Sequence, residues 1–343
     1  MEPLPASPNA SSGLAWRTLA VSAAAALSLM LAACQPAAPI APTAAPSKPA
    51  EPPKPAASPA ASAPSPVTKP AASPAASPAA SPAASPAAGA APPVVQIGAR
   101  DFAFDSPDTI AAGLTTIELR NTGSEPHHVQ LLRLNDQVTF EQFTVALAQG
   151  EGPALALVSL DGGVGQLAPR GTGEVVVNLR PGTYVLICFV PSPDGIPHLA
   201  KGMVKQVRVA PAPAVAVPVA APQVAGTVTM KDFSFDLPAT IGPGRLVYRV
   251  VNEGPQQLHE TNLVRLEAGK VLADVTTFVA SEGASGPPPY VPVGGMQGLS
   301  VNASGFMVTQ LQPGNYAAVC FIPDPGSGKS HLELGMGREF TVR

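Results

Sequence analysis

Apolar and polar residues alternate in short runs only from Val94 onward. Examples are VVQIG, TTIELR, GEVVVNL and TYVLICFV, and Gly, Pro and Asn separate such runs. This pattern is typical of strands in an antiparallel sandwich. Residues 35–93 show no alternation, because Ala, Pro and Ser fill this segment. The chain is therefore predicted to be all-β after a long N-terminal region that cannot build a core.

The folded region contains one sequence twice. RDFAFDSPDTI matches KDFSFDLPATI, ELRNTG matches RVVNEG, HHVQLLRL matches HETNLVRL, and LRPGTYVLICFVPSPDG matches LQPGNYAAVCFIPDPGS. The offset stays close to the 132 residues that separate Cys188 from Cys320. We predict tandem domains at 94–209 and 225–343, joined by an Ala/Pro/Val linker at 210–224. Their size and strand pattern favour two Greek-key β-sandwiches.

Each copy also has one short helical pattern. In TFEQFTVALAQ, Thr139 and Gln142 have the spacing of a capping box, and Phe140 and Phe143 fall on one helical face. In the second copy, DVTTFVA predicts a helix with Asp274 as its N-cap. The segments GGVG and GGM are expected to form loops.

The first 34 residues have the features of an export signal. Arg17 precedes the apolar run TLAVSAAAALSLMLAA, which is too short to span a bilayer comfortably, and Cys34 follows it. The ending LAAC resembles the lipobox of bacterial lipoproteins. That resemblance implies that the signal peptide at 1–33 is removed and that Cys34 carries lipid. A plain signal peptide that happens to contain a cysteine remains the alternative.

Residues 34–93 would then be a lipidated cysteine and a disordered stalk. Repeated ASPA favours polyproline II, which at about 3.1 Å per residue could reach on the order of 180 Å. We expect an exported protein, lipid-anchored to the cell membrane or outer membrane and facing the periplasm or exterior. The net charge of -3 indicates no basic surface for nucleic acid.

Side chains that can bind a transition metal are rare here, yet they recur in one order. The chain has five His and three Cys. Each copy has one His at the start of a strand, and then Cys, His and Met near the C-terminal end of the copy. The candidate ligands are His127, Cys188, His198 and Met203 in the first copy, and His259, Cys320, His331 and Met336 in the second. Two imidazoles, a thiolate and a weak thioether are the donors of a blue-copper site.

Both copies resemble cupredoxins, the plastocyanin-like blue copper proteins. PHHV at 126–129 is similar to their first-ligand segment, which favours His127 over His128 as the ligand. PGTYVLICFVPSPDGIPHLAKGM is similar to their ligand loop, although nine residues separate Cys188 from His198. The resemblance implies one type 1-like copper per domain, up to two in all. His128 corresponds to Glu260, which predicts an exposed, replaceable position.

The resemblance also implies a function. A membrane-anchored, extracytoplasmic copper protein would carry single electrons between redox partner proteins, without an enzymatic activity or a small-molecule substrate. Multicopper oxidases and nitrite reductases need further histidines, and only His128 is left over here.

Three alternatives remain open at this stage. The chain could be a copper storage or delivery lipoprotein, or a metal-free cupredoxin-like interaction module on a stalk. Cys188 and Cys320 could also form a disulfide in an oxidising compartment. Asp194 and Asp324 lie in the Cys–His loops, where they are expected to stabilise turns.

Overall fold

The computed structural model describes residues 89–213 and 218–343. The predicted signal peptide, Cys34 and the stalk up to residue 88 lie outside the described residues. The first copy contains β1 Val94–Arg100, β2 Ala103–Asp105, β3 Thr109–Ala111, β4 Gly113–Asn121, β5 His127–Leu134, α1 Phe140–Gln149, α2 Glu151–Leu155, β6 Val158–Leu167, β7 Thr172–Leu179, β8 Gly182–Ile187, a 3-10 helix His198–Lys201 and β9 Val204–Ala210. The second contains β10 Gly226–Lys231, β11 Ser234–Asp236, β12 Gly244–Asn252, β13 His259–Leu266, α3 Leu272–Ala280, β14 Tyr290–Leu299, β15 Ser304–Leu311, β16 Gly314–Val319 and β17 Gly337–Val342.

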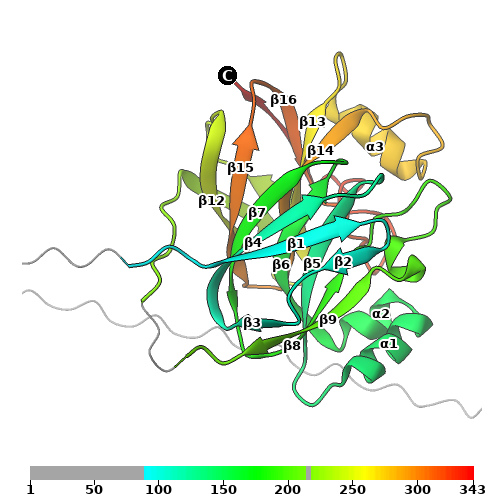
Figure 1. The fold of residues 1–343 in the computed structure, drawn as a ribbon. Helices are drawn as coiled ribbons and strands as arrows, with labels where there is room; N and C mark the ends of the chain where they lie inside the picture. Colours follow the sequence, from blue (N-terminus) through cyan, green and yellow to red (C-terminus); the bar gives the residue numbers. More distant parts are fainter. Residues whose placement is uncertain (1–88, 214–217) are drawn as a thin grey trace, which may run out of the picture. The chain divides into compact units, whose positions relative to one another are not determined.

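These strands form two sheets, and strands of both copies take part in each sheet (Figure 1). One sheet has the order β11-β10-β12-β15-β7-β4-β1-β2, and the other has the order β17-β16-β13-β14-β6-β5-β8-β9-β3. Each copy thus contributes strands to both layers of a sandwich, with an apolar core between them. The predicted fold class, all-β with two cupredoxin-like sandwiches, is confirmed. The domain boundaries stay predictions, although β1 and β10 begin close to them.

The two copies pair through equivalent strands. β6 pairs antiparallel with β14, with Val164 opposite Met296, and β7 pairs antiparallel with β15, with Val175 opposite Met307. Both pairs join residues that correspond in the two copies, so a local two-fold axis relates the copies. Because each of these strands finds its partner in the other copy, neither copy leaves this edge of its sheets unpaired.

The glycine-rich segments lie in strands, so the expectation that they form loops was wrong. Gly162, Gly163 and Val164 belong to β6, and the GGM segment belongs to β14. Gly163 has a φ of 136° and lies at a bulge against β5, where an added Cβ would stand 2.0 Å from the carbonyl oxygen of Val129. Glycine is needed at this bulge because the strands approach too closely for a side chain.

Helices α1 and α3 cover the outer face of the second sheet, each in its own copy. α1 begins after Thr139, whose capping box with Gln142 is confirmed, and Phe143 is fully buried against β5 and β8. α3 begins earlier than predicted. Its N-cap is Val271, and Asp274 is instead the third helical residue, whose carboxylate accepts a hydrogen bond from the Val271 backbone. The prediction of Asp274 as N-cap was wrong because the helix starts one turn sooner.

No helix in the described part of the chain is long and apolar enough to cross a membrane.

Candidate metal centres

The first centre gathers three donors from separate parts of the first copy. His127 begins β5, Cys188 directly follows β8, and His198 begins the 3-10 helix. Because β5 and β8 are neighbouring antiparallel strands, the start of one lies near the end of the other. The Nδ1 atoms of His127 and His198 are 2.9 Å apart, and Cys188 Sγ lies 3.5 Å from His198 Nδ1. All three side chains are fully buried.

The loop after Cys188 folds back on itself and brings the Met203 backbone against Cys188 and His198. Met203 donates its backbone N–H to the His198 carbonyl, and the Cys188 N–H donates to the Met203 carbonyl. The Met203 side chain is fully buried. At the outer end of the loop, Asp194 accepts the Ile196 N–H and pairs with Lys201, which confirms the turn-forming role expected for Asp194.

The second centre repeats this geometry despite a loop one residue longer. His259 Nδ1 lies 3.1 Å from His331 Nδ1, and Cys320 Sγ lies 3.4 Å from that same nitrogen. Met336 donates its N–H to the His331 carbonyl and accepts the Cys320 N–H. Asp324 accepts hydrogen bonds from the Ser327 backbone and hydroxyl, so its expected turn role is confirmed as well.

The outer ring nitrogens of the first centre both meet carboxylates. His127 Nε2 lies 2.9 Å from Asp101 Oδ1, and His198 Nε2 lies 3.0 Å from Glu125 Oε2. Because an ionised carboxylate can only accept, each Nε2 carries a proton, and in a neutral imidazole the Nδ1 atom then presents a lone pair. Two lone pairs that face each other at 2.9 Å repel, and a cation between them removes this repulsion.

In the second centre, Asp232 Oδ1 lies 2.9 Å from His259 Nε2, and Gln257 Oε1 lies 2.7 Å from His331 Nε2. Such outer partners orient the imidazoles that bind a metal.

The sequence did not predict these outer partners, although the Asp-Phe pair is part of the repeated segments RDFAFDSPDTI and KDFSFDLPATI. Asp101 and Phe102 form the turn between β1 and β2, and Asp232 and Phe233 form the matching turn. Both phenylalanines have positive φ, 65° and 62°, and their rings meet His198 and His331 edge-on. A non-glycine residue with positive φ is uncommon. The signal available in the sequence was the recurrence of the Asp-Phe pair at the same place in both copies.

The expected exposure of His128 and Glu260 is wrong. Both are buried, and each accepts the backbone N–H of the residue after the cysteine, Phe189 or Phe321, at 2.9 Å. Both faces of β5 and β13 are covered, one by the opposite sheet and the other by a helix. Burial, which penalises the charged form, lowers the pKa of His128 to about 3 and raises the pKa of Glu260 to about 7.

The two thiols are free and buried, so the disulfide alternative is wrong. Burial raises the pKa of Cys188 to about 12 and also raises the pKa of Cys320. Without a cation each cysteine therefore stays a thiol at neutral pH. Metal binding would have to release that proton, since the thiolate is the ligand.

The donor set fits copper. Donors that share one transition metal at about 2.0–2.3 Å lie roughly 3–4 Å apart. The distances from His198 Nδ1 and from His331 Nδ1 to the other two donors of their centres fall in or just below this range. In the described residues, His127, Cys188 and His198 form one such cluster, and His259, Cys320 and His331 form the other. With a buried methionine tied to each, they are two type 1 copper-like sites, one per domain.

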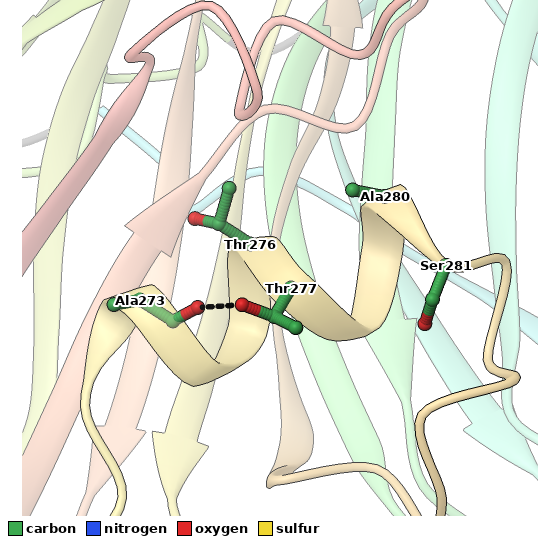
Figure 2. Close-up of a pocket in the computed structure, with 5 residues that line it drawn as sticks. All are labelled: Ala273, Thr276, Thr277, Ala280 and Ser281. Atoms are coloured by element: carbon green, nitrogen blue, oxygen red, sulfur yellow. Dashed lines mark hydrogen bonds between the residues drawn. The ribbon is translucent and has the colours of Figure 1, made fainter.

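A separate hollow lies over α3. It is lined by Ala273, Thr276, Thr277, Ala280 and Ser281, with Thr277 donating a hydrogen bond to the Ala273 carbonyl (Figure 2). None of these five side chains is titratable or a transition-metal donor, so the hollow offers no chemistry comparable with that of the metal centres.

No family model and no curated protein matches the chain. Among solved structures, it is similar to reduced auracyanin from Roseiflexus castenholzii, at 25% identity over 36% of this chain and 100% of that one, with a TM-score of 0.26. It is also similar to auracyanin A, a "blue" copper protein from Chloroflexus aurantiacus, at 23% identity over 35% of this chain and 99% of that one, with a TM-score of 0.24.

A third likeness spans both copies. The copper-containing nitrite reductase of Thermus scotoductus is 14% identical over 73% of this chain and 61% of that one, with a TM-score of 0.22. At TM-scores this low, the assignment of the two sites rests on their donor geometry and not on these likenesses.

Proposed function

We propose that this protein is a non-enzymatic electron carrier with two type 1-like copper sites, bound to the outside of a bacterial membrane. Copper supplies a one-electron couple between Cu(I) and Cu(II). The observation that supports this function is the arrangement of two fully buried imidazoles and one buried thiol in each copy. The Nδ1 atom of the second histidine lies 2.9–3.5 Å from the other two donor atoms, and all three donors lie within 4.8 Å of one another.

The surrounding residues hold these donors in place before any metal binds. Backbone hydrogen bonds tie the cysteine, the second histidine and the methionine of each loop together. Asp101 and Asp232 fix the ring of the first histidine. A site that is held in one geometry by its surroundings reorganises little when an electron is gained or lost, which is what a carrier requires.

The comparison with a copper store also favours a carrier. Each domain offers one closed donor set, whereas a store would expose many donors to take up several ions. His128, the one histidine that is not among the candidate copper ligands, already accepts the Phe189 N–H. It is therefore not free to build the second copper centre of an oxidase or nitrite reductase.

The anchor is a separate part of the proposal. LAAC at Leu31–Cys34 supports lipid attachment at Cys34, and the Ala/Pro/Ser segment that follows would serve as a tether. If so, the protein is exported, and its partners are the membrane and extracytoplasmic redox proteins. In cells, Cys34→Ser should move the protein from the membrane fraction to the soluble fraction. Unchanged membrane attachment would argue against the lipid.

Copper titration of a fragment from residue 89 onward tests the carrier function. We expect an intense thiolate-to-copper band in visible absorption that saturates at two equivalents. Cys188→Ser and Cys320→Ser should each leave one equivalent, and the two together none, with unchanged far-ultraviolet circular dichroism. The band should bleach and return over repeated cycles of reduction and oxidation. No band and no tight copper would leave a metal-free module, and copper uptake without reversible cycling would favour storage or delivery.

A further inference from the structure

The two metal centres differ at the residue that holds the second histidine. In the first copy, His198 Nε2 meets the carboxylate of Glu125 at 3.0 Å. In the second copy, His331 Nε2 meets the amide oxygen of Gln257 at 2.7 Å. Glu125 and Gln257 correspond in the two copies, since each stands two residues before the first histidine ligand.

The frame around this position is the same in both copies. Asn121 donates its side-chain amide to the Glu125 carbonyl at 2.8 Å, and Asn252 donates to the Gln257 carbonyl at 2.9 Å. The carboxylate at the first histidine, Asp101 or Asp232, lies at 2.9 Å in both centres. The two copies therefore offer a matched comparison, in which an ionised acceptor is exchanged for a neutral one.

The orientation of the Gln257 amide is fixed by its other end. Its Nε2 donates to Asp324 Oδ1 at 2.9 Å, so its oxygen faces His331. The second centre thus has a carboxylate behind the amide, but not in contact with the ring. In the first centre the charge lies directly on the imidazole N–H, and the Glu125 side chain is mostly shielded from water, with 22% of it exposed.

An ionised acceptor stabilises an imidazole more when the ring carries more positive charge. Hydrogen bonds in which one partner is ionised are roughly twice as strong as those between neutral groups. An imidazole bound to Cu(II) is more polarised than one bound to Cu(I). Glu125 should therefore favour the oxidised site beyond what Gln257 can do.

Resting on the proposed function, we propose that Glu125 and Gln257 set the reduction potentials of the two coppers apart, with the first domain lower. When one electron is shared by the two sites, it then resides in the second domain: the first copper is Cu(II) and the second is Cu(I). Glu125 acts through His198, so it is a positioning and tuning residue. The two sites are an ordered pair and not two equal copies.

One other difference lies close to the donors and has to be controlled. Glu260 is buried beside Cys320, where the first copy has His128. The comparison of the two domains is therefore made with Glu260→Gln present throughout, which removes any charge at this position.

The test measures each copper alone. Cys320→Ser leaves the first site and Cys188→Ser leaves the second, and spectroelectrochemistry gives each potential from the visible band. We expect the first site to have the lower potential. Glu125→Gln should raise it by about 59 mV, which for one electron corresponds to a tenfold change in the equilibrium constant. The reciprocal variant, Gln257→Glu, should lower the second potential by a similar amount.

The outcomes separate the two levels of the argument. If the unaltered protein binds no copper or has no reversible couple, the proposed function fails. If both coppers cycle but Glu125→Gln leaves the first potential unchanged or lowers it, the tuning role fails while the carrier function stands. Should Glu125→Gln not fold, Gln257→Glu decides alone, because an unchanged or raised second potential overturns the proposal.

Discussion

Glu260 allows a quantitative prediction about the metal-free protein. Its carboxyl is buried and accepts the Phe321 N–H, and burial raises its pKa from the ordinary value of 4.5 to about 7. Between these two values the folded state holds a proton that the unfolded state releases. Stability is therefore greatest below about pH 4.5 as far as this group is concerned, and it falls as the pH rises through 7.

The size of the effect follows from the shift. One pKa unit corresponds to 1.36 kcal/mol, so a shift of roughly 2.5 units costs on the order of 3 kcal/mol at high pH. Part of this loss has already occurred at pH 5. From pH 5 to pH 8.5, the contribution of Glu260 to the free energy of unfolding should fall by roughly 2.5 kcal/mol.

Glu260→Gln removes the titration while it keeps an acceptor for the Phe321 N–H. Urea unfolding, followed by far-ultraviolet circular dichroism at pH 5 and pH 8.5, gives the free energy of unfolding for both proteins. Their difference should shift by roughly 2.5 kcal/mol in favour of the variant as the pH rises. Because His128 titrates equally in both proteins, it cancels from the comparison.

Glu267→Gln is the matched control, since Glu267 lies in the same copy but is exposed. The difference between this variant and the unaltered protein should hardly change between the two pH values. A pH-independent difference for Glu260→Gln as well would refute the reasoning, because it would mean that the buried, charged Glu260 does not lower the free energy of unfolding.

The strand pairing between the two copies and the residues around the metal centres give three further predictions. His127 on β5 and His259 on β13 lie beside opposite ends of the paired strands β6 and β14, separated by six residues along the strands and by three strand spacings. Pulsed electron paramagnetic resonance should therefore place the coppers on the order of 25 Å apart. Strong exchange coupling between the coppers would contradict this register. Gly163→Ala should lower the thermal midpoint sharply, because its Cβ would meet the β5 backbone at a positive φ, whereas Gly152→Ala, with open space around its Cβ, should not. Asn121→Ala should cost about 1–3 kcal/mol in urea unfolding, because it loses hydrogen bonds to the buried Leu167 carbonyl and the partly buried Glu125 carbonyl; an unchanged midpoint would show that water replaces them.

Much of the candidate site could be predicted because its donors are chemically distinctive. Cysteine, histidine and methionine are scarce in this chain, and the duplication repeats them in one order, so chance is a poor explanation. The alternation of apolar residues predicted the strands for a similar reason, since it follows directly from which face of a sheet is buried. The α1 capping box is equally local, and it was predicted correctly from Thr139 and Gln142.

The errors share a different origin. His128 and Glu260 look like replaceable surface residues, but a helix covers the outer face of their strands. GGVG and GGM look like loops, but a bulge lets them pair on both sides. In both cases the outcome depends on which element packs against the strand, and the spacing of residues along the chain does not carry that information.

The sequence by itself determined the strand content, the duplication and the order of the copper donors, because periodicity and residue chemistry are properties of the chain. Only the tertiary structure decided which groups meet the outer nitrogens of the imidazoles. Asp101 reaches His127 across 26 residues, and Glu125 reaches His198 across 73. The pairing of β6 with β14 is likewise a contact between the two copies. Such contacts arise when folding brings distant segments together. The contact of Glu125 with His198, which Gln257 makes with His331 in the second copy, is what makes the two otherwise similar sites different.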